Sequence, residues 1–305
     1  MKVCNFLFLF LFSFSLLAQN GPSNPLSARS NGVSNASIAF TGINSIFNNQ
    51  AGLASLENSG ILFSGQQTFI NPNSDNFGVG FAIPTTSGTF GIDIHHFIND
   101  DLNQIILGFA YARKLMPKLS AGIQFEMRSS QFAPYERLIL FSSERKEFFT
   151  AEIGLQYKLL EKLLIGVHFS NPAKLEIKED EFLPRIIRAG ATYFVSEKLL
   201  VHAELEKDFE LPFVFKSGLE WELADELWLR IGFHNKPITF NLGTGYKFKN
   251  GLRIDFACYY QNGLDLVGSG ISSLSGFIPS FGIGFDFKKK ERLKKLRLDK
   301  QNKKR

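Results

Sequence analysis

The chain has 305 residues and a net charge of +5 at pH 7, with 33 Phe and 26 Gly but only two Cys. After the N-terminal segment, no stretch approaches 18 consecutive apolar residues, which excludes an inner-membrane protein built from transmembrane helices. The two cysteines are Cys4, which lies in that N-terminal segment, and Cys258. Removal of the segment would leave Cys258 alone, so no intrachain disulfide is expected.

The positive charge is concentrated at one end of the chain. The last eighteen residues, 288–305, carry a net charge of +9, so residues 1–287 carry −4. The basic isoelectric point therefore describes a tail and does not indicate that the body of the protein binds nucleic acid.

Residues 1–18 are predicted to be a secretory signal peptide. Lys2 precedes a nearly unbroken run of Phe and Leu, and Ala18 precedes Gln19 at a position suited to cleavage. An uncleaved signal anchor is the alternative, but the apolar run is shorter than the roughly 20 residues that a spanning helix needs. We therefore expect an exported chain.

Residues 19–58 are rich in Asn, Ser, Gly and Ala and show no sustained period-2 pattern. We interpret them as an N-terminal plug or hatch that precedes a barrel, with a flexible secreted N-terminus as the alternative. Asn48 and Asn49 are placed to cap a short helical turn that follows them. The predicted plug motif consists of Asn48, Asn49, Gln50, Ala51, Gly52 and Leu53.

Residues 59–287 are predicted to form an all-β, antiparallel transmembrane β-barrel of about 14 strands. Apolar and polar residues alternate in blocks of about ten, as strand side chains do when they point to opposite faces. Asn250 and Gly251 form a strong hairpin signal between two such blocks. The predicted strands are 60–70, 75–84, 88–97, 103–114, 117–128, 146–158, 162–170, 185–195, 197–206, 212–222, 225–234, 237–248, 251–260 and 277–287.

The face opposite the apolar one carries charges of both signs. If the apolar face meets lipid, these residues line the lumen, where they can pair across a narrow interior without forming an ion pore. A soluble barrel would instead bury the apolar face, but export and the absence of a cysteine framework favour the membrane version. The predicted lumen-facing charges are Glu126, Arg128, Glu152, Arg188, Glu204, Arg230, Arg253 and Asp255.

Motifs for catalysis are scarce. No phosphate-binding loop, zinc-ligand spacing or nucleophile elbow is present. His168 and Ser170 share one face of a strand and superficially resemble the His-x-Ser arrangement of outer-membrane phospholipases. Those enzymes present the pair to lipid, whereas here it lies on the lumen side, and we find no third residue to orient the histidine. We predict no enzymatic activity and no cofactor.

The barrel is expected to end at Phe287, an aromatic residue suited to closing the sheet. Residues 288–305 are then predicted to be a basic periplasmic tail. Its leucines allow a short amphipathic helix on an anionic leaflet or a partner, and a solvated tail is the alternative.

Several segments resemble the PorV/PorQ family within the FadL-type superfamily of outer-membrane barrels, typical of Bacteroidota. Residues 27–32 and 46–54 are similar to the family's N-terminal hatch, with Gln50 where its Asn-Pro-Ala-Gly-Leu motif has proline. Other segments look like the family's mid-barrel and last strands, in the same order. They are 166–172, 183–193, 217–221, 227–233 and 242–246.

The resemblance implies a 14-stranded barrel with a plug and no cofactor, located in the outer membrane. It also implies one of two functions. Our main hypothesis is an accessory barrel of type IX secretion, with secretion components or another barrel as partners beside the membrane lipid. The alternative is a channel for hydrophobic small molecules. A bulged or glycine-broken strand among Gly78, Gly80, Gly88 and Gly91 would favour transport.

Overall fold

The computed structural model describes residues 26–67, 75–98, 102–132, 145–173, 175–178, 181–209, 211–261 and 276–287. The predicted signal peptide, the first residues of the predicted plug (19–25) and the basic tail lie outside the described residues. Within the described part, no helix has the length and apolar character needed to cross a bilayer.

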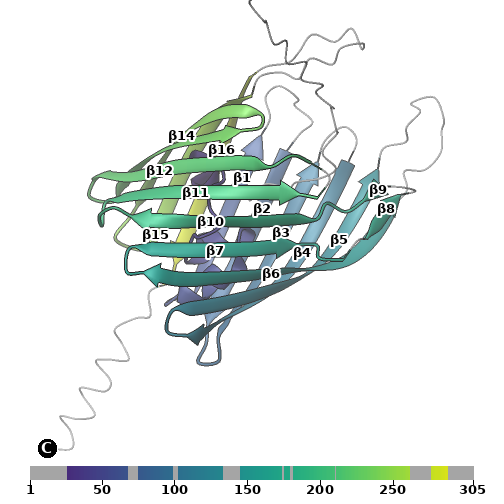
Figure 1. Ribbon diagram of the computed structural model, residues 1–305, viewed down its shortest axis with the longest axis horizontal. Coiled ribbons are helices and arrows are strands. Elements are labelled where there is room, and N and C mark those ends of the chain that lie inside the picture. Colours follow the sequence, from purple (N-terminus) through teal and green to yellow (C-terminus); the bar gives the residue numbers. More distant parts are fainter. Residues whose placement is uncertain are drawn as a thin grey trace, which may run out of the picture.

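Fourteen strands form a closed antiparallel barrel (Figure 1), which confirms the predicted fold class. β1 and β16 close it, with pairs running from Gly60 and Asp286 to Gln66 and Ser280. The wall strands are β1 (Gly60–Gln67), β2 (Asp75–Pro84), β3 (Thr89–Ile98), β4 (Leu102–Met116), β5 (Leu119–Phe132), β6 (Arg145–Leu160), β7 (Leu163–Ser170), β10 (Ile186–Phe194), β11 (Leu199–Asp208), β12 (Val214–Ala224), β13 (Leu227–Asn235), β14 (Ile238–Lys247), β15 (Leu252–Gln261) and β16 (Gly276–Asp286).

Two features of the sheet differ from the prediction. The connection between β7 and β10 contains a small two-stranded sheet, β8 (Glu176–Lys178) and β9 (Glu181–Phe182), which we predicted as a loop. β5 continues to Phe132 instead of ending at 128, because its ladder with β6 extends to the pair of Gln131 with Arg145. Short strands and strand ends carry too few alternating residues to be seen in one sequence.

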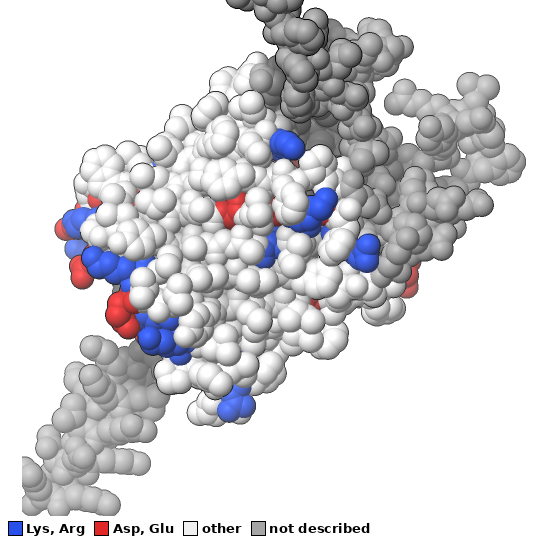
Figure 2. Space-filling view, in the orientation of Figure 1, with Lys and Arg blue, Asp and Glu red and all other residues white. Residues whose placement is uncertain are grey.

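Wall side chains alternate between a buried interior and an apolar exterior. In β11, His202 and Glu204 are 1% and 2% exposed, whereas Val201 and Leu205 are 39% and 46% exposed. Figure 2 shows a largely uncharged wall with scattered charged side chains, and a denser cluster of charges at its left edge, where Figure 1 places short turns. A water-soluble barrel would have the opposite arrangement, so the exterior is suited to lipid.

The segment before β1 lies inside the barrel (Figure 1, purple). It contains helix α1 (Ala28–Gly32) and the 3-10 helices η1 (Ile43–Phe47) and η2 (Gln50–Ser55). The Asn49 side chain accepts a hydrogen bond from the Ala51 N–H and caps η2, as the sequence predicted. Asn48 does not cap it; its amide donates to Ser30 Oγ and to the Asn44 carbonyl.

Candidate functional site

The lumen is filled by residues 26–56, and inward-facing glycines allow this segment to lie directly against the wall. A Cβ atom at Gly166 would lie 2.5 Å from the Ile38 carbonyl oxygen, and one at Gly232 would overlap the backbone of Ser34. Such close approach between two backbones requires glycine. We call these wall positions the glycine belt, which comprises Gly122, Gly154, Gly166, Gly218, Gly232 and Gly243.

The glycine belt makes a testable prediction. Gly218→Ala places a methyl group against Val33, whereas Gly282→Ala finds its nearest atom, the Ala28 Cβ, at an ordinary 3.4 Å. We expect Gly218→Ala to cost about 1–3 kcal/mol through overpacking and to loosen the lumen segment. Limited proteolysis and the thermal transition of the detergent-solubilised protein measure this. Equal behaviour of the two variants would show that the close approach does not exist.

Ion pairs join the lumen segment to the wall on one side of the barrel. Arg29 of α1 binds Glu220 through two hydrogen bonds, Nε to Oε2 at 2.9 Å and Nη2 to Oε1 at 2.8 Å. Arg230 also donates to Glu220 Oε2 at 2.8 Å, and its Nη1 lies 2.8 Å from Asp255 Oδ1. His202 Nε2 lies 3.0 Å from the second Glu220 oxygen. Glu220 is thus a fully buried carboxylate whose two oxygens are both engaged.

Glu204 holds the next part of the lumen segment. Its Oε2 accepts hydrogen bonds from the backbone N–H groups of Ser37 and Ile38, both at 2.9 Å. The Lys216 ammonium lies 3.7 Å from Glu204 and 2.6 Å from Glu206. Glu204 is therefore held by two backbone donors and by a cation that it shares with Glu206.

Gln50 ties η2 to three wall strands. Its Nε2 donates to Gln124 Oε1 at 3.1 Å and to Glu152 Oε2 at 3.0 Å, while its Oε1 lies 3.1 Å from His168 Nε2. A proline at this position could make none of these contacts. The sequence interpretation placed Gln50 in the plug motif and noted that it replaces a proline of the family, but it missed these contacts with the wall.

The expectation that His168 lacks a third partner was wrong. His168 Nε2 lies 3.4 Å from Glu152 Oε2 as well as near Gln50, because Glu152 lies on the neighbouring strand β6 opposite Ser170. Ser170 Oγ is 3.3 Å from His168 Nδ1, but Arg188 Nη2 is closer to the same nitrogen, at 3.0 Å. The imidazole is fully buried. Because it contacts Gln50 of the lumen segment and Arg188 of the wall, we interpret this cluster as a structural contact between the two.

The predicted lumen charges are distributed around the interior and do not form one site. Arg128 Nη2 lies 2.7 Å from Glu126 Oε2 on β5, and Arg253 of β15 pairs with Asp286 at 3.1 Å. The structure buries all of them except Arg253, which is partly exposed near the short turns. The buried ones are Glu126, Arg128, Glu152, Arg188, Glu204, Arg230 and Asp255.

Arg29 and Asp93 are among the interior residues that sequence reasoning did not identify. Asp93 of β3 is 4% exposed and lies on the inward side of its strand. Arg29 could have been identified from the sequence, since it is the only charged residue between positions 19 and 56. A single charge in an otherwise neutral buried segment predicts a buried partner. Among the residues of known position, no group of three His, Cys, Asp or Glu side chains could hold a metal ion.

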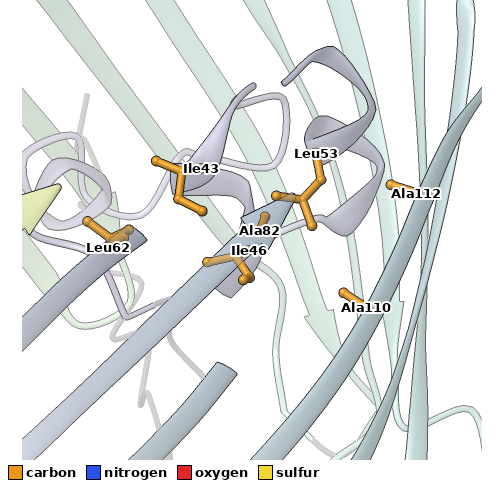
Figure 3. Close-up of a cluster of buried hydrophobic side chains, with 7 residues drawn as sticks. All are labelled: Ile43, Ile46, Leu53, Leu62, Ala82, Ala110 and Ala112. Carbon is orange, nitrogen blue, oxygen red and sulfur yellow. The ribbon is translucent and has the colours of Figure 1, made fainter. Parts of the chain in front are cut away.

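A cluster of apolar side chains joins η1 and η2 to another part of the wall (Figure 3). Side chains of η1 and η2 pack there against Leu62 of β1 and alanines of β2 and β4, and a Cβ at Gly80 would lie only 2.7 Å from Ile46 Cγ2. Within the described ranges, η1 forms no hydrogen bond to the wall. We call this contact the apolar seam, which comprises Ile43, Ile46, Leu53, Leu62, Ala82, Ala110 and Ala112.

The wall beside the apolar seam is continuous. β2 and β3 pair without a register shift from Asp75 and Ile98 to Pro84 and Thr89. Gly78, Gly80 and Gly91 lie in these ladders and Gly88 lies in the turn, so the bulge that would have favoured transport is absent from this described part of the sheet. A hydrophobic path here must run between the lumen segment and the wall.

The closed barrel, its apolar exterior and its filled, charged lumen together define an outer-membrane β-barrel with an internal plug. No protein-family model matches the sequence, and no curated protein matches it.

Solved structures with a similar fold include a hydrocarbon channel, a FadL homologue and a toluene transporter. The CymD monoaromatic hydrocarbon channel has a TM-score of 0.70 and 14% identity over 86% of this chain and 98% of that one. A Pseudomonas aeruginosa FadL homologue has a TM-score of 0.66 and 11% identity over 86% of this chain and 98% of that one. The Pseudomonas putida toluene transporter TodX has a TM-score of 0.60 and 11% identity over 86% of this chain and 97% of that one. The chain therefore has the FadL-type fold.

Proposed function

We propose that this protein is an outer-membrane channel for small hydrophobic molecules, which pass along the apolar seam. The observation that carries the proposal is the unequal attachment of the plug. Arg29, Ser37 and Gln50 are anchored to the wall by ion pairs or hydrogen bonds, whereas η1 meets it through apolar contacts. A displacement of η1 would open the seam without breaking a buried ion pair, which would be the costlier change.

The solved structures support this reading over the secretion hypothesis that the sequence favoured. CymD is described as a monoaromatic hydrocarbon channel and TodX as a toluene transporter. Their folds are similar to this one over most of both chains. A solute of that class is apolar and small, which suits a seam lined by Ile, Leu and Ala side chains.

Uptake by whole cells tests the proposal. The protein is expressed in a strain that lacks its own hydrophobic-solute channel, and initial uptake of labelled toluene and of a labelled long-chain fatty acid is compared with that of a labelled sugar. We expect uptake of at least one apolar solute to rise above the empty-vector level while sugar uptake stays unchanged. A rise for all solutes, or for none, would contradict the proposal.

A second candidate is an accessory barrel of the PorV/PorQ kind. The buried ion pairs around Glu220 and the unbroken ladders from β1 to β3 favour it, because a partner-binding barrel can remain sealed. Purification from native outer membranes in mild detergent distinguishes the two. Stoichiometric recovery of a secretion component would support the accessory function, and recovery of the barrel with apolar small molecules would support the channel.

A further inference from the structure

A cavity of about 160 Å³ lies near the short-turn end of the barrel, between the plug and strands β12 to β15. None of its lining residues belongs to the apolar seam, although Asn44 of η1 is one of them, and most of its side chains are charged. Four basic side chains line it, together with two carboxylates and two aromatic rings. The charged residues are Arg29, Arg230, Lys247, Arg253, Glu220 and Asp255.

The cations of this cavity outnumber the carboxylates that pair with them. Glu220 and Asp255 are shared between Arg29 and Arg230. Arg253 has an ion-pair partner outside the lining, Asp286. Lys247 forms no ion pair among the residues that the structure describes. The four cations therefore face three carboxylates when Asp286 is counted, and one positive charge has no partner among them.

Arg253 also has an unused donor. Its Nε is buried and has no hydrogen-bond partner within the described part of the chain, while its Nη2 binds Asp286. A buried donor without a partner costs free energy that a bound acceptor would recover. The guanidinium fork matches the two oxygens of a carboxylate or a phosphate.

We infer that this cavity is a binding site for a small oxyanion, a carboxylate or phosphate group, held chiefly by Arg253 and Lys247. The volume is that of about five water molecules at roughly 30 Å³ each, enough for such a group and a short substituent. The bound anion would face Arg29 from the plug and Arg253 from the wall. The site does not depend on the proposed transport, because its occupancy is measured without permeation.

Calorimetric titration of the full-length protein in detergent tests the site, with inorganic phosphate and hexanoate as separate probes. We expect one or both anions to bind, and the preferred probe identifies the group. Arg253→Gln and Lys247→Gln are each expected to weaken binding about tenfold or more, the usual effect of losing a charged hydrogen bond. Lys198→Gln, at another short turn, should bind as the unmodified protein does.

Two results would overturn the inference. One is that neither anion binds the unmodified protein. The other is that Arg253→Gln and Lys247→Gln both retain full affinity. Lys247 is exposed at the end of β14, so its replacement tests the site even if Arg253→Gln fails to fold.

Discussion

Uptake of a hydrophobic solute is expected to fall to the empty-vector level when η1 is locked to the wall by a disulfide between Ile46→Cys and Gly80→Cys. A Cβ at position 80 would lie 2.7 Å from Ile46 Cγ2, so two cysteines there are close enough to bond. The lock holds the apolar seam shut, and reduction should restore uptake. Cys258→Ser removes the remaining cysteine of the barrel.

A second lock provides the matched control for this experiment. Ala28→Cys with Gly282→Cys joins α1 to β16, where the Ala28 Cβ would lie 3.4 Å from a Cβ at 282. Because α1 is already fixed by the ion pair of Arg29, this lock should leave uptake unchanged. Loss of uptake in both locked proteins, or in neither, would show that movement of η1 relative to β2 does not open the path.

Glu220→Gln is expected to be the most destabilising single substitution in the lumen. It removes the buried carboxylate that faces Arg29, Arg230 and His202, and leaves two guanidinium groups short of a partner. Breaking a buried pair in this way costs about 3–5 kcal/mol. We expect a lower thermal transition in detergent and greater conductance in planar bilayers, because the end of the plug near α1 is released.

Glu161→Gln is the control for charge removal. Glu161 pairs with Lys158 in an exposed turn between β6 and β7 and contributes little, so the thermal transition should not change. If Glu220→Gln melts like this control and conducts no more current, the buried network does not hold the plug.

The architecture of the wall could be predicted because period-2 alternation is a local property. The wall strands alternate outward apolar residues with inward residues that are mainly polar or small, so the fourteen strands were recognisable from residue order alone. The cap at Asn49 was equally local. β8 and β9 were missed because strands of three and two residues leave no periodic signal.

The lumen could not be predicted to the same depth, because its contacts join residues far apart in the chain. Arg29 and Glu220 are 191 positions apart, and Gln50 and Glu152 are 102 apart. The sequence indicated which charges face inward, but not that the plug meets one part of the wall through buried ion pairs and another through apolar contacts. The wall residues at these apolar contacts are mostly Gly and Ala, whose small side chains give no clear hydropathy signal.

The same limit explains why the sequence favoured a secretion role. The segments that resemble the PorV/PorQ family lie in the hatch and in barrel strands, and they carry information on fold. The features that bear on transport are the continuity of the β2–β3 ladder and the apolar contact between η1 and the wall, and both arise only when the chain is folded.

The most direct test of the apolar seam as a transport path is photo-labelling in cells. A small apolar diazirine is supplied from outside, activated by light, and its attachment sites are mapped by mass spectrometry. We predict adducts on buried residues of the seam, such as Ile46, Leu53 and Ala110, in addition to the lipid-facing Phe109 and Phe125. Adducts confined to lipid-facing residues would contradict the account.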